Sequence, residues 1–146
     1  MSAKSIVCGV TGSENSEKAV RAASQTALAQ GARLTFVYVV DVGFLSGLTV
    51  QLRPKYASDF LERLGGKILD EAATIASSLG VTAKTALRTG KVMDEVVKVI
   101  KEEHADLLVV GDEGRTFAEK VLFGNSLPDN VKELEQRAGV TVSIVR

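Results

Sequence analysis

The chain has 146 residues, and its 18 Lys and Arg balance its 18 Asp and Glu. This length predicts one domain over residues 1–146, and a net charge of zero provides no long-range attraction to a nucleic acid or an anionic membrane, so neither is expected as a partner. The single cysteine, Cys8, cannot form an intramolecular disulfide, and we expect neither a secretory leader nor a membrane span, which together favour the cytoplasm.

The first third of the chain predicts a strand, a helix and a second strand. Residues 5–10 (SIVCGV) are apolar and β-branched, and they run into a Thr-Gly-Ser turn. Small apolar residues at helical spacing follow, with Ser13 or Asn15 available as the N-cap and Gly31 placed to end the helix. Residues 33–40 (RLTFVYVV) predict a second strand that is buried on both faces.

Residues 41–57 form the longest stretch without a periodic pattern. The stretch combines glycines and a proline with several large apolar residues, which is consistent with a functional segment that folds onto a surface or with ordinary packing over the sheet edge. A long helical pattern follows from Ser58 to Gly80. Gly65 and Gly66 weaken its middle by about 1 kcal/mol each relative to alanine, so a local kink is expected there.

The second half repeats the alternation of strands and helices. Residues 81–87 alternate weakly and predict a strand near a sheet edge, and residues 92–104 carry an apolar helical face. Residues 106–110 (DLLVV) predict another buried strand. A last helix with Ser126 as its cap precedes a fifth strand at residues 140–145 (VTVSIV).

Strands that alternate with helices predict an α/β fold, a three-layer sandwich around a five-stranded parallel sheet with right-handed crossovers. We expect the strand order 3-2-1-4-5, because it places two glycine-containing loops together, one after the first strand and one after the fourth. Ligands of open parallel sheets bind beyond the carboxyl ends of the strands at such a switch point.

The second of these loops contains three glycines, Gly111, Gly114 and Gly124, spaced G-x2-G-x9-G and followed by Asn125 and Ser126. Glycines let backbone N–H groups approach phosphate oxygens, and a helix N-terminus adds unpaired donors. The pattern is neither a Walker A loop nor G-x-G-x-x-G. The same glycines are also explained by a strand end, a turn and a helix end without any ligand.

Three features together resemble the universal stress protein family: residues 10–19 (VTGSENSEKA), residues 105–115 (ADLLVVGDEGR) and the glycine spacing. The resemblance covers nearly the whole chain. It implies the adenine nucleotide alpha hydrolase-like fold, which matches the architecture above, and a homodimer. Members of the family divide into those that bind ATP through this glycine pattern and those that lack the pattern and bind none.

Carried over to this chain, the resemblance implies a nucleotide site built from the ends of the first, second and fourth strands and the loop after the fourth. Adenine would lie near the strand ends and the phosphates near the glycines. The implied nucleotide-binding residues are Val10, Thr11, Gly12, Val40, Gly111, Gly114, Arg115, Gly124, Asn125 and Ser126. No catalytic residue and no metal ligand of the protein is implied.

The sequence departs from the family pattern within this site. Thr11 replaces the usual Asp of the first turn, Gly9 replaces a common Pro, and Asn125 separates the third glycine from the hydroxyl of Ser126. Asp112 and Glu113 lie between the first two glycines, and each would repel a phosphate charge by roughly 3 kcal/mol at ~6 Å and an effective dielectric of ~20. A magnesium ion would reverse that repulsion, and Arg115 is the obvious nearby cation to oppose it.

Two residues that attract attention have simpler interpretations. His104 is the only histidine and is expected as a protonated C-cap of its helix, at the wrong end of the sheet for a Ser-His-Asp triad. Cys8 lies within the first strand and is expected to be an inert core thiol. One His and one Cys do not make an ordinary zinc site.

These observations predict a dimeric stress-response regulator that binds ATP, with magnesium as its companion ion, and uses nucleotide occupancy to bias an unidentified protein partner. At most weak ATPase activity is expected, because no evident general base other than Asp112 or Glu113 lies beside the phosphates. The alternative is an interaction module of the same fold that binds no nucleotide. A third hypothesis is a small phosphohydrolase whose acids at 111–116 bind a metal. The apolar edge of residues 140–145 is expected to pair with its copy in the homodimer.

Overall fold

The computed structural model describes residues 3–41, 54–112 and 131–146, with the side chains of 54–58 excepted. These residues form five strands and four helices. The elements are β1 (Ser5–Gly9), α1 (Glu14–Gln30), β2 (Arg33–Asp41), α3 (Pro54–Ser78), β3 (Lys84–Gly90), α4 (Val92–Glu102), β4 (Leu107–Gly111), α6 (Val131–Ala138) and β5 (Thr141–Val145).

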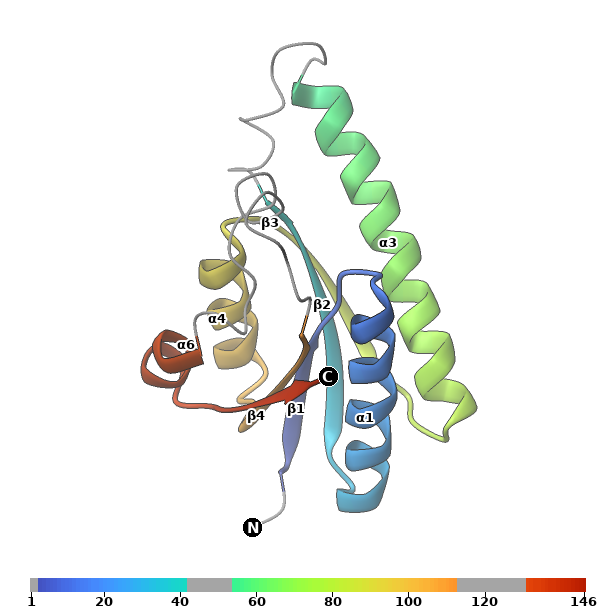
Figure 1. Cartoon of the computed structure of the whole chain (residues 1–146), viewed down its shortest axis with the longest axis vertical. Helices are drawn as coiled ribbons and strands as arrows, with labels where there is room; N and C mark the ends of the chain where they lie inside the picture. Colours follow the sequence, from blue (N-terminus) through green and yellow to red (C-terminus); the bar gives the residue numbers. More distant parts are fainter. Residues whose placement is uncertain (1–2, 42–53, 113–130) are drawn as a thin grey trace.

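The strands form one parallel sheet in the order β3-β2-β1-β4-β5, which confirms the predicted topology. Helices α1 and α3 cover one face of the sheet, and α4 and α6 cover the other (Figure 1). The chain therefore has the predicted three-layer α/β architecture. The weakly alternating third strand lies at one edge of the sheet, as expected, and β5 lies at the other.

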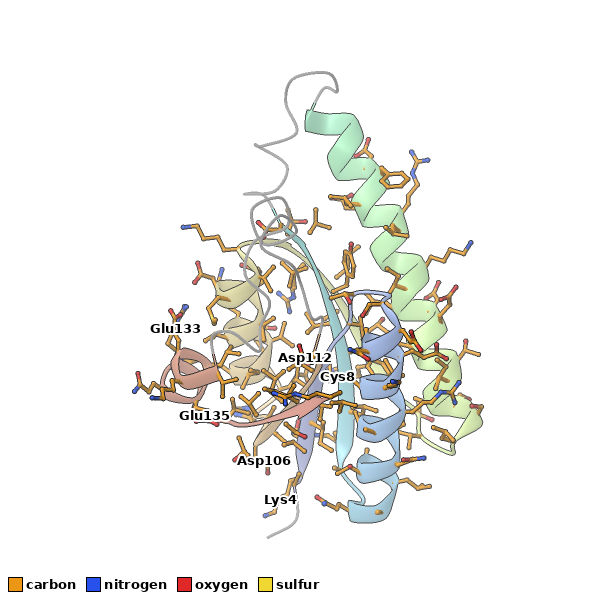
Figure 2. The ribbon with its side chains drawn as sticks, in the orientation of Figure 1. Lys4, Cys8, Asp106, Asp112, Glu133 and Glu135 are labelled. Carbon is orange, nitrogen blue, oxygen red and sulfur yellow. The ribbon has the colours of Figure 1, made fainter. Side chains whose placement is uncertain are left out.

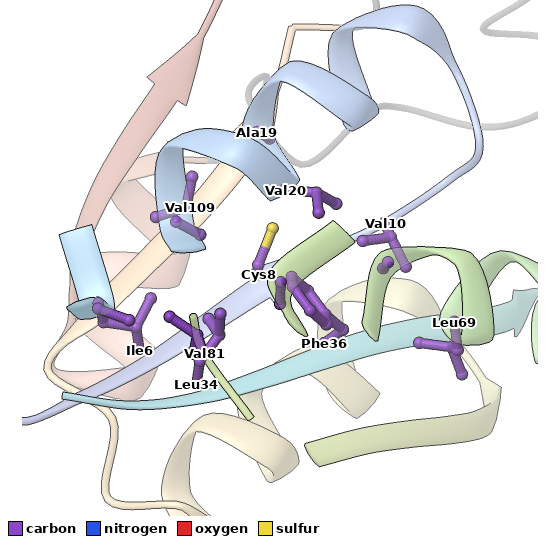
Figure 3. Packing of buried hydrophobic residues seen from close by; sticks show 14 residues of the cluster. Ile6, Cys8, Val10, Ala19, Val20, Leu34, Phe36, Leu69, Val81 and Val109 are labelled. Carbon is purple, nitrogen blue, oxygen red and sulfur yellow. The ribbon is translucent and has the colours of Figure 1, made fainter. Parts of the chain in front are cut away.

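The larger core cluster fills the space between the sheet and the helices α1 and α3 (Figure 3). Phe36 of β2 is fully buried there beside Cys8 of β1. Small residues of α1, such as Ala19 and Ala23, let that helix lie close over the sheet. A second cluster joins β1, β2 and β4 to α4 and α6, with Leu134 of α6 fully buried.

The boundaries of the third strand were predicted three residues too early. Gly80 adopts a φ of 92°, and Val81 donates its N–H to the Ala76 carbonyl at 2.9 Å. This closes the carboxyl end of α3 in the manner of a Schellman motif, with Val81 as the buried residue that follows it. The strand begins only at Lys84, because Val81 belongs to the helix end.

The long helix begins at Pro54 rather than at Ser58, so the irregular stretch expected at 41–57 was predicted to end four residues too late. Proline is well tolerated at the first position of a helix, where its missing N–H would have no intrahelical partner. The helix continues through Gly65 and Gly66 without interruption. A Cβ at Gly65 would lie 2.4 Å from Cδ1 of Tyr38, so this glycine lets α3 pack onto β2.

Asp106 joins the amino ends of β1, β4 and β5, through its carboxylate toward β1 and its main-chain carbonyl toward β5. Its carboxylate accepts hydrogen bonds from the backbone N–H groups of Lys4 and Ser5, and Thr141 donates its N–H to the Asp106 carbonyl (Figure 2). His104 lies at this end, two residues before Asp106. This confirms the prediction that it lies at the end of the sheet opposite the carboxyl ends of the strands. It is not the cap itself, because α4 is capped by Glu103 and His104 follows with a φ of 51°.

None of the helices in the ranges that the structure describes is both long and apolar enough to cross a membrane.

Candidate functional site

The carboxyl edge of the sheet is stepped at the switch point between β1 and β4. The pairing of β1 with β2 ends at Gly9 and Val37, whereas β2 continues against β3 as far as Asp41 and Gly90. Residues 38–41 of β2 therefore project beyond the end of β1 by roughly 13 Å at ~3.3 Å per residue. Within this projecting part Tyr38 and Val39 are half-buried and Val40 is buried, although the strand was expected to be buried on both faces throughout.

The loop after β1 is organised by its own hydroxyl groups. The Ser13 hydroxyl caps α1 by accepting from the Ser16 N–H at 3.0 Å, which decides between the two predicted N-caps. The Ser16 hydroxyl accepts from the Thr11 N–H at 2.9 Å. Thr11 donates its hydroxyl to the Ser13 hydroxyl at 3.2 Å and accepts from the Ser13 N–H at 3.4 Å. The Thr11 side chain, proposed from the sequence as a ligand donor, thus also helps to hold this turn.

Two of the predicted glycines have structural reasons in the fold itself. Gly12 adopts a φ of 86°, where other residues are strained. Gly111 lies against the first turn of α1, and a Cβ there would lie 2.5 Å from the backbone oxygen of Asn15. Helix α1 and strand β4 are therefore in backbone contact at the switch point, and any side chain at position 111 would separate them.

Asp112 joins three elements just beyond β4. The Asn15 side-chain amide donates to the Asp112 carbonyl, which links it to α1. The Asp112 N–H donates to the Val145 carbonyl at 2.8 Å, which links it to β5. The first turn of α1 and the ends of β4 and β5 therefore form one hydrogen-bonded unit beside the step in the sheet.

The Asp112 carboxylate forms an ion pair with Arg146, whose Nε lies 3.2 Å from Oδ2. The sequence had offered Arg115 as the cation that opposes the acids of this loop, and Arg146 was missed. The signal was present but indirect: Gly111 is the register partner of Val145, so the residues that follow them lie side by side. Arg146 can be predicted as the neighbour of Asp112 only when β5 is known to pair with β4.

The structure brings together part of the predicted site. Val10, Thr11, Gly12 and Gly111 surround the junction of β1, β4 and α1, and Val40 lies on the projecting part of β2. The side chains of Val10 and Val40 are buried, and Val40 packs against Tyr38 and Leu61. A ligand at this step would therefore meet their main chain. The remaining predicted residues lie outside the described residues: Gly114, Arg115, Gly124, Asn125, Ser126 and the acid Glu113.

Cys8 is not placed to act as a nucleophile. Cys8 is fully buried, and its burial raises the pKa of the thiol far above the ordinary value, so the thiol stays protonated and inert, as predicted. Within the described ranges, no group of three or more His, Cys, Asp or Glu side chains is placed to hold a metal ion.

Comparisons with known proteins agree with this architecture. The model of the universal stress protein family matches residues 2–138. A universal stress protein of Methanocaldococcus jannaschii is 31% identical over 122 residues, which cover 84% of this chain and 72% of that protein. Among solved structures, a universal stress protein in complex with cAMP is 29% identical, with a TM-score of 0.68 over 100% of this chain and 98% of that one. A universal stress protein from Archaeoglobus fulgidus in complex with dAMP, at 18% identity and a TM-score of 0.66 over 100% of both chains, shares the fold. The chain belongs to the universal stress protein family.

Proposed function

We propose that the protein binds an adenine nucleotide at the carboxyl ends of β1 and β4, and that ATP is its physiological ligand. The observation that carries this proposal is the stepped edge at the switch point, where β2 projects beyond β1 and the first turn of α1 meets β4. Ligands of open parallel sheets bind at this position. The 29% identical relative in complex with cAMP supports the choice of an adenine nucleotide.

The chain offers suitable groups for such a ligand. The projecting residues 38–41 of β2 would form a wall beside the adenine, with the main chain at Val40 and Val10 as its polar contacts. By the family pattern, Gly111, Gly114 and Arg115 would lie near the ribose and first phosphate, and Gly124, Asn125 and Ser126 near the outer phosphates. Magnesium would accompany ATP and offset part of its phosphate charge.

Slow or absent turnover is part of the proposal. Asp112 is one of the two carboxylates that the sequence offered as a general base, and it is paired with Arg146. Because Oδ2 of Asp112 contacts the Arg146 guanidinium, that oxygen is less available to take a proton from an attacking water. We therefore expect a regulator in which nucleotide occupancy biases the binding of a protein partner, rather than an efficient ATPase.

One observation favours a second candidate, an interaction module without nucleotide. Gly111 is required by the contact with Asn15, and Gly12 by its backbone conformation, so two glycines of the site need no ligand to explain them. The two candidates differ in ligand affinity alone, because both keep the same fold.

Nucleotide extraction and titration distinguish the two candidates. The purified protein is denatured by heat and the supernatant is assayed for adenine nucleotides, and nucleotide-free protein is titrated calorimetrically with ATP, magnesium-ATP and cAMP. Stoichiometric nucleotide or micromolar affinity supports the nucleotide site. The absence of both, from a folded protein, would leave the interaction module. Magnesium-dependent phosphate release at turnover rates would instead support the phosphohydrolase.

We also propose that the protein is a cytoplasmic homodimer that pairs through β5. Thr141 and Val145 use main-chain groups toward β4, so strand alternation directs the N–H groups of Val142 and Ile144 away from it. Among the described strands β5 has a neighbour on one side only, and an edge strand of this kind readily pairs with its copy. Sedimentation equilibrium at micromolar concentration tests the dimer, and a monomer would contradict it.

A further inference from the structure

The ion pair between Asp112 and Arg146 has an unusual position for a surface ion pair. It lies directly beyond β4 and β5, next to the switch point at which we place the ligand. Elsewhere in the described residues, ion pairs of Lys84 with Glu103 and of Arg88 with Glu102 tie β3 to the carboxyl end of α4. The pair at 112 and 146 instead places one negative and one positive charge beside the proposed phosphate position.

The main chain of Asp112 is held independently of its carboxylate. Its carbonyl accepts from the Asn15 amide and its N–H donates to the Val145 carbonyl, and neither bond needs the side chain. The arginine side chain, by contrast, is 77% exposed, and the aspartate side chain is 34% exposed. The charges can therefore be changed by substitution while the backbone that forms the edge of the site stays in place.

From this arrangement we infer that Arg146 neutralises Asp112 and thereby lets the site accept a ligand with several phosphate charges. The inference rests on the proposed nucleotide site and adds Arg146 to it. Asp112 alone would repel a phosphate ligand, Arg146 cancels that repulsion, and the loss of either partner should change the affinity in proportion to the ligand charge. ATP carries several negative charges near neutral pH and cAMP carries a single one, so the loss of one partner should affect ATP binding more than cAMP binding.

The expected effects differ between the two ligands and between the two partners. At low ionic strength, Arg146→Gln should weaken ATP binding about tenfold and cAMP binding about twofold, as screened Coulomb attraction at a mostly exposed site predicts. Asp112→Asn should strengthen ATP binding by a similar factor and change cAMP binding little. The double variant should return close to the parent protein, because the two charges oppose each other.

The experiment titrates the full chain and these variants with ATP and cAMP, first at low salt and then in high potassium chloride. Each substitution should change the ATP affinity more than the cAMP affinity at low salt, and high salt should remove most of that difference. Exposed charges are screened within roughly 10 Å at 0.1 M. Lys84→Gln is the matched control. It removes one exposed positive charge from an ion pair, with Glu103 at 2.8 Å, at the amino ends of the strands. It should leave both affinities unchanged.

The outcomes separate this inference from the proposal on which it rests. If ATP and cAMP bind but the variants shift both affinities by the same factor, or if the difference persists in high salt, Asp112 and Arg146 do not act through charge and the inference is wrong. If neither nucleotide binds the parent protein or Asp112→Asn, the nucleotide site itself is refuted. Thermal melts of each variant confirm that the protein under titration is folded.

Discussion

Replacing Gly111 with alanine tests the backbone contact at the centre of the site. The added Cβ would lie 2.5 Å from the Asn15 oxygen, 2.6 Å from its carbonyl carbon and 2.8 Å from the Ser16 nitrogen. All three are backbone atoms, so no rotamer change relieves the overlap. Helix α1 must retreat from β4 by just under an ångström to restore an ordinary contact of 3.4 Å.

The cost of Gly111→Ala follows from two opposing terms. Overpacking a tight contact costs about 1–3 kcal/mol, and the upper part of that range applies because a whole helix must move. The lower conformational entropy of alanine in the unfolded chain returns about 0.4–1 kcal/mol. We therefore expect the free energy of unfolding to fall by about 2 kcal/mol and Tm to fall by about 4–8 °C.

Urea unfolding followed by circular dichroism measures this change, and Gly66→Ala is its matched control. Gly66 is also a glycine in regular structure, but a Cβ there would meet nothing within 4 Å outside its own helix. Its replacement should stabilise the protein by about 0.5–1 kcal/mol through helix propensity. If Gly111→Ala stays within about 0.5 kcal/mol of the parent, the contact with Asn15 does not determine the glycine, and the reasoning is refuted.

Three further predictions concern other parts of the fold. His104→Gly should raise the free energy of unfolding by about 1 kcal/mol, because His104 holds a φ of 51°; a lower denaturation midpoint in urea would contradict this. Burial raises the pKa of the Cys8 thiol in the folded state, so only the unfolded chain loses that proton as pH rises past about 8.5. Stability should then fall by roughly 1.4 kcal/mol per pH unit, and unfolding curves of Cys8→Ala should lack that slope. Ile144→Pro should make the proposed dimer sediment as a monomer, whereas Ile144→Ala, which loses the same side-chain packing but keeps its N–H, should remain a dimer.

The sequence by itself determined the architecture. Short apolar runs such as 5–10 and 106–110, bounded by turn residues, predict buried strands, and helical segments between them favour parallel pairing with crossover connections. Local signals also placed Gly31 at the carboxyl end of α1 and narrowed its N-cap to Ser13 or Asn15, because caps depend on neighbouring residues alone. Boundaries failed where a residue serves two elements: Val81 has the composition of a strand but closes α3.

The tertiary structure alone decided how the candidate site is built. Arg146 and Asp112 are 34 positions apart in sequence, and only the pairing of β4 with β5 brings their charges together. The contact of Gly111 with Asn15 likewise depends on the height of α1 above the sheet, which no local pattern encodes. The step at the switch point arises from the relative lengths of paired strands. These features depend on contacts between distant segments, whereas the sequence pattern reports the preferences of neighbouring residues.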